Sequence, residues 1–485
     1  MVKNNKKEKK ELIEYDVIII GSGSAASLID ASLQKGYKTA LIDRGPAGGT
    51  CLNVGCIPSK MLISVADRIT EIRESDKFHV KSKIEKINFQ EIMKDMKKET
   101  VPTHKNILKS LREASKKESN FDFYNTTGKF VDKYILEVED KLIKGKRIFI
   151  ASGSRPLIPK IKNIEKTDYL TNETLLDLKE LPKSIVIIGG GYISCEYAHF
   201  FSALGSEVTI LQSNKTLVPA EDEEISKLLE QKLSKRIKIH TNTRAEEVKE
   251  LGNNKIQVIA KNKGKGKKIK LSGEKILLAT GRTSNADILN TEKTNLELDK
   301  RGYLKTNEFM ETNMKGIYCF GDANGKAMFT HAANEEAPIA WHNSQLLNKK
   351  TSQKVSFDYS KVPHAIFTHP SIAGIGLNEE QTKDKIKNKE LTKEDILVGK
   401  ANYTDIAKGK SLRQEGTFAK AIINKNNGEI LGFHIMGPEA PVLIQEVTNA
   451  ISNNQTLNSL ARGIHIHPAL SELILRTFSN LRRIQ

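Results

Sequence analysis

Two cysteines with four residues between them are the side chains in this sequence best suited to do chemistry. Cys51 and Cys56 lie in the glycine-rich segment Gly48–Lys60, and the 485-residue chain contains only four cysteines. Glycines on both sides let the backbone bend tightly, so the two sulfurs can meet and close a small ring. A disulfide across so short a loop removes little chain entropy and stabilises a fold little. The spacing therefore predicts a disulfide that opens and closes during a reaction.

Lys60 stands four positions after Cys56, behind a proline that favours the start of a helix. One turn of such a helix would bring its ammonium near the second sulfur, and a nearby cation favours the reactive thiolate. The alternatives are two inert core cysteines or half of a zinc site. Zinc needs two more ligands at a comparable spacing, whereas Cys195 and Cys319 are each isolated. We therefore predict a redox pair and no metal site.

A second candidate group lies near the C-terminus, where His465, His467 and Glu472 surround Pro468. The proline is expected to open a helix, with Glu472 about one turn on. A carboxylate that binds one imidazole nitrogen fixes the tautomer and leaves the other nitrogen as a base. A His-x-His pair by itself is equally typical of metal ligands or buried histidines, so the residues alone leave these alternatives open.

Two segments have the pattern of a dinucleotide-binding unit. In the first, an apolar strand at Tyr15–Ile20 runs into the turn Gly21–Ala26, a helix follows, and a second strand at Lys38–Ile42 ends in Asp43. Backbone N–H groups at the start of such a helix bind a pyrophosphate, and the acid accepts from ribose hydroxyls. Because strand, turn, helix and acid all stand in order, the segment predicts a bound dinucleotide.

The pattern recurs with a strand at Ser184–Ile188, the turn Gly189–Ser194, a helix at Cys195–Leu204 and a strand at Glu207–Leu211. Ser194 replaces the usual third glycine, and since serine is small, we expect close packing of helix and strand to survive. Two such units in one chain imply two dinucleotides.

The second unit departs from an NAD-specific pattern at Gln212, where a glutamate commonly binds the adenosine ribose. Glutamine still hydrogen-bonds a 2′-hydroxyl, but it does not repel a 2′-phosphate. Ser213, Asn214 and Lys215 could receive that phosphate. The sequence therefore leaves NAD and NADP both open.

The composition is that of a soluble globular protein, with 38% hydrophobic residues and 28% charged residues. The net charge is +18, but its lysines are scattered, apart from the N-terminal tail and a run at Lys261–Lys270 that is expected to be an exposed hairpin tip. No aromatic residues interleave with these cations, so we predict no nucleic-acid binding.

No apolar run in the sequence approaches the roughly 20 residues that span a bilayer. The basic N-terminus has neither the apolar core of a secretion signal nor the arginines of a mitochondrial presequence. We therefore expect a cytoplasmic protein without membrane attachment. In that reducing compartment a disulfide is more often catalytic than structural.

The segment Gly48–Lys60 resembles the active-site motif of the flavoprotein disulfide reductases, the class I pyridine nucleotide-disulfide oxidoreductases. That motif reads Gly-Gly-Thr-Cys, four residues, then Cys-Ile-Pro-Ser-Lys, and every position matches. The turn at Gly321–Ala323 resembles the flavin-ribityl site of the same family. The resemblance runs from about Tyr15 to Ser479.

The resemblance implies an α/β fold with two Rossmann-like domains, for FAD and NAD(P), and a C-terminal α+β dimerisation domain. The implied boundaries are a flexible basic tail at 1–14, an FAD-binding domain at 15–153 and 282–355, an NAD(P)-binding domain at 154–281, and an interface domain at 356–485. Helix is expected over much of 61–117 and β-structure over 124–150.

The resemblance also assigns roles. Electrons would pass between a dithiol or disulfide substrate, the Cys51–Cys56 disulfide, FAD and NAD(P). His467 would be the acid/base that reaches the disulfide of the other subunit, with Glu472 as its orienting partner, and Lys60 would pair with Glu196 beside the flavin. Ala469 replaces a commoner threonine of this motif, and His465 is expected to be structural. The implied contacts are Gly21, Gly23, Ser24, Ala25, Asp43, Arg44, Gly49, Thr50, Lys60, Gly128, Ser152, Gly321, Asp322 and Ala323 for FAD, and Gly189, Gly191, Tyr192, Ile193, Gln212 and Gly281 for NAD(P).

Within the family, the His-x-His-Pro ending followed by Ser471 and Glu472 favours dihydrolipoamide dehydrogenase. Its implied partners are a second copy of the chain and lipoamide, which is either free or carried on a lipoyl-bearing acyltransferase complex. An NADPH-dependent reductase of small disulfides, of the glutathione reductase kind, is the alternative. Mercuric reductase is disfavoured because its C-terminal cysteine pair is missing from Leu481–Gln485. A redox-sensing flavoprotein without turnover is disfavoured by the complete set of implied catalytic residues.

Overall fold

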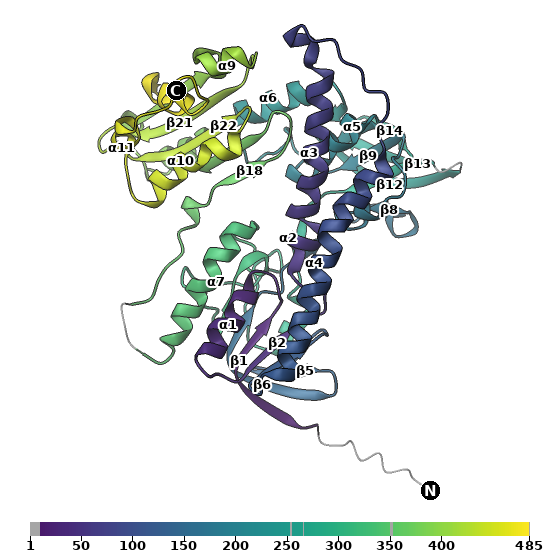
Figure 1. The fold of residues 1–485 in the computed structure, drawn as a ribbon, viewed down its shortest axis with the longest axis vertical. Helices are drawn as coiled ribbons and strands as arrows, with labels where there is room; N and C mark the ends of the chain where they lie inside the picture. Colours follow the sequence, from purple (N-terminus) through teal and green to yellow (C-terminus); the bar gives the residue numbers. More distant parts are fainter. Residues whose placement is uncertain (1–9, 253–254, 265, 350–352, 485) are drawn as a thin grey trace. The chain divides into compact units, whose positions relative to one another are not determined.

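The computed structural model describes residues 10–252, 255–264, 266–349 and 353–484. The chain divides into two compact units (Figure 1). The first comprises Met1–Pro58, Asp95–Arg155 and Arg282–Tyr359, and the second comprises Ser59–Lys94, Pro156–Gly281 and Ser360–Gln485.

The first unit is built on a seven-stranded sheet in the order β3-β2-β1-β6-β5-β4, with β17 also paired to β6. Strands β3, β2, β1, β6 and β17 are parallel, and β5 and β4 continue the sheet antiparallel. Its strands are β1 (Leu12–Ile20), β2 (Thr39–Ile42), β3 (Phe121–Tyr124), β4 (Lys129–Asp132), β5 (Ile135–Val138), β6 (Lys141–Ile150) and β17 (Ile317–Cys319).

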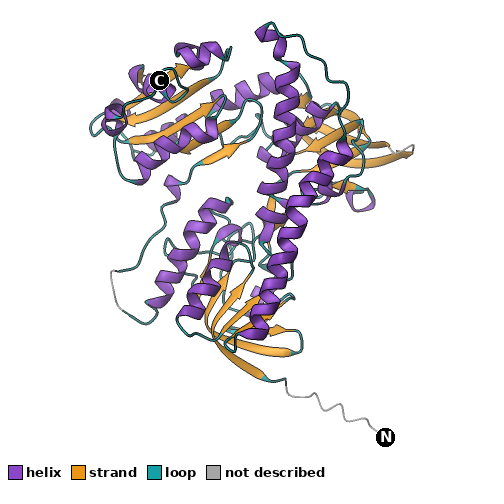
Figure 2. Ribbon diagram, viewed as in Figure 1, coloured by secondary structure: helices purple, strands orange, loops and turns teal. Residues whose placement is uncertain are grey.

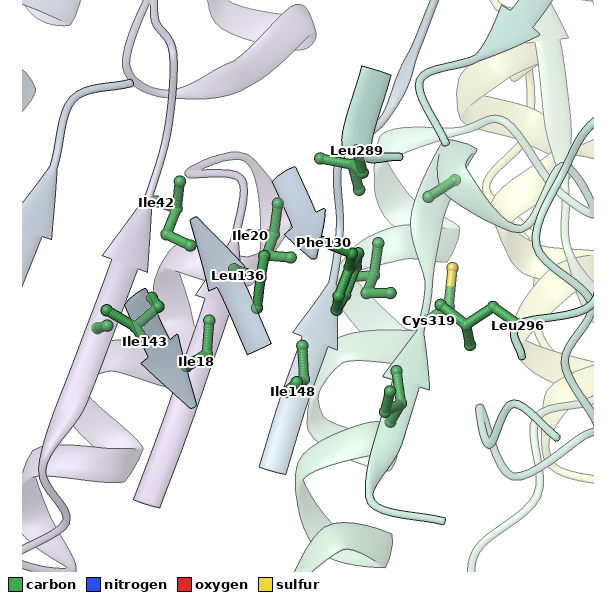
Figure 3. Close-up of a cluster of buried hydrophobic side chains, with 14 of the residues drawn as sticks. Ile18, Ile20, Ile42, Phe130, Leu136, Ile143, Ile148, Leu289, Leu296 and Cys319 are labelled. Carbon is green, nitrogen blue, oxygen red and sulfur yellow. The ribbon is translucent and has the colours of Figure 1, made fainter. Parts of the chain in front are cut away.

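Strand β1 is apolar on both faces, as expected of a central parallel strand. Val17 and Ile19 point to one face and pack with α1 (Ser27–Gln34) and α7 (Thr330–Gln345). Ile18 and Ile20 point to the other face, where they join the cluster of buried side chains in Figure 3. Both faces of the strand are therefore held by packing up to Ile20, and the first dinucleotide turn begins at the next residue, Gly21.

The expected loose tail is shorter than the sequence predicts. Leu12–Glu14 belong to β1 and pair with Leu142–Lys144 of β6, because the long β6 offers backbone partners beyond the apolar segment. Residues 1–9 of the predicted tail lie outside the described residues.

The second unit contains the second dinucleotide-binding pattern on a five-stranded parallel sheet in the order β11-β10-β9-β15-β8. Its strands are β8 (Tyr169–Leu170), β9 (Ser184–Ile188), β10 (Glu207–Leu211), β11 (Lys238–His240) and β15 (Lys275–Leu278). The predicted bounds of β9 and β10 are confirmed. Helix α5 (Tyr192–Leu204) follows the glycine turn, and every residue of it from Ser194 onward is buried. Ser194 thus packs as closely as predicted.

An antiparallel sheet of β12 (Thr243–Gly252), β13 (Lys255–Asn262) and β14 (Lys268–Gly273) packs on that parallel sheet. Strands β13 and β14 form the hairpin predicted at Lys261–Lys270, and residue 265 of its turn lies outside the described residues. The short strands β7 (Ser154–Pro156) and β16 (Arg282–Ser284) pair with each other.

The C-terminal part of the second unit is a six-stranded sheet in the order β18-β19-β22-β21-β20-β23. Helix α10 (Ala440–Ser452) packs on β19 and β22 (Figure 2). The strands are β18 (His364–Ile366), β19 (Ile372–Gly376), β20 (Ile396–Asn402), β21 (Phe418–Asn424), β22 (Ile430–Met436) and β23 (Leu481–Arg483). The other helices of this part are α8 (Glu379–Lys387), α9 (Ala407–Ser411), α11 (Leu457–Arg462) and α12 (Glu472–Ser479).

Strands β20 and β23 were not predicted from the sequence. Helix α12 ends at Ser479, and the chain then pairs with β20. The arginines of β23 give no strand signal, since its hydrogen bonds come from a partner strand about 80 residues earlier in the chain.

The helical segment expected at 61–117 is two helices, α3 (Cys56–Arg73) and α4 (Phe89–Lys117). His79 adopts a left-handed conformation, with φ of 62°, and the residues from Val80 to Asn88 belong to no helix or strand. Asn88 accepts the N–H of Glu91 and so caps the start of α4. The remaining helices are α2 (Gly49–Val54) and α6 (Glu223–Leu233).

In the described part of the chain, one helical run, Gly49–Arg73, is long and apolar enough to cross a membrane, judged by length and composition alone. This corrects the expectation that no apolar run approaches that length. The run is interrupted at Gly55, where α2 ends, and its Lys60 pairs with a buried glutamate, so we treat it as part of the folded protein.

Candidate functional site

Helices α2 and α3 carry the two cysteines, and Gly55 between them sets the bend. A Cβ atom on Gly55 would lie 2.9 Å from the carbonyl oxygen of Thr50, so only glycine lets the helices meet this closely. In the structure Cys51 and Cys56 are thiols, half-buried and exposed respectively. A hydrogen bond with Cys56 and burial raise the pKa of the Cys51 thiol. The predicted pair is therefore brought together.

Thr330, the first residue of α7, is a neighbour of this pair that the sequence analysis missed. Its Oγ1 lies 3.4 Å from Sγ of Cys56. The two residues are 274 positions apart in the chain. The only local signal was that threonine stands just before an alanine-rich stretch, a typical helix start.

Lys60 and Glu196 lie together, as the family resemblance implies. The Lys60 ammonium is 2.8 Å from Oε2 of Glu196 and 4.6 Å from the centre of the Phe367 ring. The other carboxylate oxygen accepts the Phe367 N–H at 3.0 Å. The Glu196 side chain is 4% exposed, so this ion pair is shielded from water on the carboxylate side. Phe367 was not predicted.

The C-terminal histidines each bind a glutamate. His467 Nδ1 lies 2.8 Å from Oε1 of Glu472, while the N–H of Ala469 donates to the other carboxylate oxygen at 3.0 Å. The hydrogen bond from His467 lowers the pKa of Glu472, and the Ala469 N–H adds to it. The His467 side chain is 71% exposed, which leaves Nε2 facing outward as a base.

The structure corrects one local detail of this segment. Pro468 does not open α12, which begins at Glu472. The carboxylate of Glu472 instead bridges back to His467 and Ala469 and holds the intervening turn. His465, predicted to be structural, binds Glu446 of α10 at 2.8 Å.

The first dinucleotide turn is packed so tightly that its glycines are required. A Cβ on Gly21, whose φ is 105°, would lie 2.3 Å from the carbonyl oxygen of Ala151. A Cβ on Gly49 would lie 2.7 Å from the Cα of Gly23. Asp43 accepts the Ser22 N–H at 2.5 Å, which joins the acid at the end of β2 to the turn.

Ser152 supplies the test of whether this turn fits FAD. Its Oγ is buried and has no hydrogen-bond partner in the described part of the chain. An orphaned hydroxyl beside a glycine turn is what a polar ligand would satisfy. Gly128 lies behind the site, where a Cβ would press on Ile42 at 3.1 Å. The remaining predicted contacts of this part are Ser24 and Ala25 in the 3-10 turn before α1, Arg44 after β2, and Thr50 in α2.

Asp322 lies in a network that the sequence showed only in part. Ser154 donates its hydroxyl to Oδ2 of Asp322 at 2.6 Å, and Nε of Arg282 donates to the same hydroxyl oxygen at 2.6 Å. In the described residues the other carboxylate oxygen of Asp322 has no partner, so it is open to a ligand hydroxyl. The residues thus fit FAD.

Glu336 holds the loop that carries Asp322. It is fully buried in α7 and accepts the N–H of Gly321 at 2.6 Å and the amide of Asn324 at 3.0 Å. The Tyr359 hydroxyl donates to it as well. Burial raises the pKa of Glu336. Gly321, Asp322 and Ala323 are therefore fixed by a side chain that no motif pointed to.

The second turn has the same close glycine packing. A Cβ on Gly189 would lie 2.1 Å from the carbonyl oxygen of Ala279, whereas a Cβ on Gly191 would meet nothing within 4 Å. Gly191 precedes α5, so Tyr192 and Ile193 occupy its first turn beside open space. Gly281, with φ of 117°, is equally open. On this side of the turn, no neighbouring atom lies within 4 Å of a Cβ placed on Gly191 or Gly281.

Gln212 is folded across the second turn. Its side chain is buried, a Cβ on Gly190 would lie 2.7 Å from its Cδ, and its Nε2 donates to the carbonyl of Thr216 at 3.1 Å. Only Oε1 remains to accept from a ribose hydroxyl. Lys215 is exposed in the adjoining loop and makes no ion pair within the described residues.

Residues 15–337 match the model of the pyridine nucleotide-disulphide oxidoreductase family, and residues 362–477 match the dimerisation domain of that family. The chain belongs to the pyridine nucleotide-disulphide oxidoreductases. The predicted family, the α/β fold with its dimerisation domain, and the cofactors FAD and NAD(P) are confirmed by these matches.

The relatives within the pyridine nucleotide-disulphide oxidoreductases act on different substrates. Mycothione reductase of Mycobacterium tuberculosis is 32% identical over 481 residues, covering 96% of this chain and 99% of that protein. Dihydrolipoyl dehydrogenase 2 of Arabidopsis thaliana chloroplasts is 34% identical over 482 residues, covering 96% and 82%. A solved structure, the HOCl-induced flavoprotein disulfide reductase RclA from Escherichia coli, has a TM-score of 0.79 at 25% identity, covering 96% and 99%. These matches fix the class of enzyme and not its substrate.

Proposed function

We propose that this chain is a dihydrolipoyl dehydrogenase-like enzyme that oxidises a dithiol through the Cys51–Cys56 disulfide and passes the electrons to NAD(P). One observation carries the proposal: a pair of adjoining thiols stands in the same chain as an outward-facing imidazole held by a carboxylate. The disulfide that two adjoining thiols form on oxidation is the group that a cyclising dithiol reduces efficiently, and the imidazole is the base such a dithiol needs.

FAD would be held by Gly21, Gly23, Asp43, Ser152 and Asp322. When bound, it supplies a two-electron carrier between the cysteine pair and NAD(P). The chain's own task at this site is to keep the ligand's polar groups satisfied and its phosphates on backbone N–H groups at the start of the helix.

The cysteines and the histidine account for the thiol chemistry. Nε2 of His467 takes the proton of one substrate thiol, and the thiolate attacks Sγ of Cys51. A mixed disulfide forms as the Cys51–Cys56 bond breaks, and the electron pair leaves on Cys56. The second substrate thiol then attacks the mixed disulfide, which releases the cyclic disulfide. His467 gives its first proton to Cys51, which becomes a thiol, and takes the proton of the second substrate thiol.

We propose that the working unit is a homodimer in which His467 acts on the cysteines of the partner. Ile464 and Ile466, just before His467 in the chain, are 101% and 77% exposed, and Val442 of α10, the helix whose Glu446 binds His465, is 65% exposed. Apolar side chains this exposed beside a base are expected where a second copy covers them. The chain's match to the dimerisation domain supports this reading. The predicted domain boundaries and cytoplasmic location stay predictions.

An NADPH-dependent reductase of a small disulfide is the second candidate. Gln212 and the exposed Lys215 favour it, because neither repels a 2′-phosphate and the lysine attracts one. The similarity to mycothione reductase supports the same direction. This enzyme would use the same cysteines in reverse.

Anaerobic mixing of the FAD-loaded protein with dihydrolipoamide tests the proposal. We expect dihydrolipoamide to bleach the flavin absorbance within the turnover time, and NAD to restore it. If dihydrolipoamide leaves the absorbance unchanged while NADPH bleaches it, the dehydrogenase proposal fails. The second candidate then requires that a small disulfide restores the colour. The Cys56→Ser variant is the control, because it keeps the fold but cannot exchange disulfides.

A further inference from the structure

Three elements meet at Glu196 in the second unit. Helix α5 provides Glu196, α3 provides Lys60, and the segment after β18 provides the Phe367 N–H. The carboxylate therefore depends on both neighbours for its position. Contacts that hold α3, α5 and the segment after β18 in place therefore also hold the Lys60–Glu196 ion pair in place.

A second set of contacts joins the same three elements, further along each of them. Asp67 of α3 lies 2.9 Å from Nε2 of His199 in α5 and 3.4 Å from Nδ1 of His369 after β18. The two imidazole rings stack with centroids 5.9 Å apart and planes 21° from parallel. Asp67 thus hydrogen-bonds His199 and forms an ion pair with His369, so it joins two histidines from different elements.

The residue spacing along each element places the ion-pair site and the second set of contacts on the same side of that element. Asp67 is seven residues, about two turns, after Lys60, and His199 is three residues after Glu196. His369 is two residues after Phe367. Each residue of the ion-pair site therefore has a counterpart in the second set on its own element.

The protonation states follow from the partners. The Arg236 guanidinium, which only donates, lies 3.1 Å from Nδ1 of His199, so Nε2 carries the proton given to Asp67. His199 is fully buried, and burial lowers its pKa, so the imidazole is neutral. His369 faces Asp67 with one nitrogen and Glu74 with the other, at 3.9 Å, which favours an imidazolium.

The charges around His369 support this assignment. Burial disfavours its charged form, but the nearby Asp67 and Glu74 carboxylates outweigh that effect and raise the pKa of His369 to about 9. The titratable groups that face this cluster are Asp67 and Arg73 of α3, Glu74 and Lys77 just after it, His199 of α5, and Arg236 after α6.

We propose that Asp67, His199 and His369 form a positioning cluster that holds the Glu196 carboxylate against Lys60 and so sets the electrostatic environment of the redox site. The inference rests on the role beside the flavin that the family resemblance implies for the Lys60–Glu196 pair, but not on the identity of the dithiol. The three residues act through Glu196 and are positioning residues.

A double-mutant cycle on the flavin potential tests this proposal. We compare Asp67→Asn, Glu196→Gln and the double variant in the FAD-loaded protein, without any dithiol present. The matched control is Glu71→Gln, which removes a charge from the same helix where it pairs only with exposed Arg68. Because Asp67 acts through Glu196, we expect Asp67→Asn to slow flavin reduction by NAD(P)H about three- to tenfold and to shift the potential in the same direction as Glu196→Gln.

The double variant should behave like Glu196→Gln alone, and Glu71→Gln like the wild type. Additive shifts, or an Asp67→Asn variant with the wild-type potential, would overturn the proposal. A failed dihydrolipoamide assay leaves this cycle unaffected, because its only reductant is NAD(P)H.

Imidazole NMR titration gives a readout that does not depend on activity. In the wild type the His369 signal should titrate near pH 9, and in Asp67→Asn it should move toward the ordinary value of 6.5. A wild-type His369 that titrates near 6.5 would contradict the cluster. If Asp67→Asn fails to fold, His369→Gln, which keeps a hydrogen-bonding side chain, takes its place in the cycle.

Discussion

The hydroxyl of Thr330 lies 3.4 Å from the sulfur of Cys56, although the two residues are 274 positions apart. The hydroxyl can donate to a thiolate at that sulfur, where the electron pair is left in the proposed reaction. The contact links the N-terminus of α7 to the redox pair.

Replacing Thr330 separates this hydrogen bond from packing. Thr330→Val keeps the shape but removes the donor, so we expect thiol alkylation of the reduced protein at neutral pH to slow by about three- to tenfold. Thr330→Ser keeps the donor and should react nearly as the wild type does. Stopped-flow alkylation of both variants makes the comparison, and equal rates for Val and Ser would rule the hydroxyl out.

His467 and Glu472 are expected to affect dithiol turnover unequally. His467→Gln removes the base and should lower kcat/KM for the dithiol by about 10²- to 10⁴-fold. Glu472→Gln leaves the base but loosens its orientation, with an expected loss of about tenfold. Reduction of the flavin by NAD(P)H should stay unchanged in both variants, since neither proton transfer nor thiol attack is needed. A parallel loss of that reduction would point to misfolding instead.

Gln212 is expected to control the choice of nicotinamide cofactor. Gln212→Glu places a carboxylate where a 2′-phosphate would bind, so the ratio of Kd values should move toward NADH by about tenfold or more. Lys215→Ala should weaken NADPH binding and leave NADH binding alone. Competition binding with both cofactors measures the two ratios. An unchanged ratio in Gln212→Glu would place the specificity elsewhere.

Lys420 is expected to be among the most sensitive positions for stability. Its ammonium is buried in β21, 2.8 Å from Asp222, 2.7 Å from Glu224 and 3.0 Å from Glu379. Lys420→Met leaves the fully buried Asp222 carboxylate without its cation, at an expected cost of about 3–5 kcal/mol in the free energy of unfolding. Urea unfolding checks this value. The exposed Lys385→Met is the control, because its partner Glu390 is also exposed.

His369 predicts a pH dependence of stability. Its pKa is raised from 6.5 to about 9, so His369 binds its proton more tightly in the folded protein than in the unfolded chain. That stabilisation is complete below about pH 6.5 and is lost as the pH rises through 9. The difference in urea midpoint between wild type and His369→Gln should therefore be larger at pH 6 than at pH 10. A difference that grows with pH would contradict the assigned imidazolium.

The partners of His369 predict the opposite change in acid. The ion pair with His369 lowers the pKa of Glu74 from 4.5 to about 2. For Asp67, burial raises the pKa, but the hydrogen bond from His199 and the ion pair with His369 outweigh it and lower the pKa from 3.8 to about 2. The two carboxylates therefore contribute to the free energy of unfolding above about pH 4.5, and this contribution is lost as the pH falls toward 2. The effect of His369 alone is best measured above about pH 4.5.

The sequence by itself determined the redox motif, both dinucleotide turns and the family. These features are local: a glycine turn between a strand and a helix, or two cysteines five positions apart, carries its meaning within a few residues. The predicted strands β9 and β10 hold for the same reason, because parallel strands buried on both faces appear as unbroken apolar runs.

Only the tertiary structure decided which distant side chains complete the site. Thr330, Phe367, Glu336 and the Asp67–His199–His369 cluster lie near functional residues through packing of elements far apart in the chain. No local pattern marks them, since a histidine in a buried helix looks the same with or without a carboxylate partner. The strand β23 was not predicted for a related reason, because it is a strand only through its pairing with the distant β20 and its own residues carry no strand pattern.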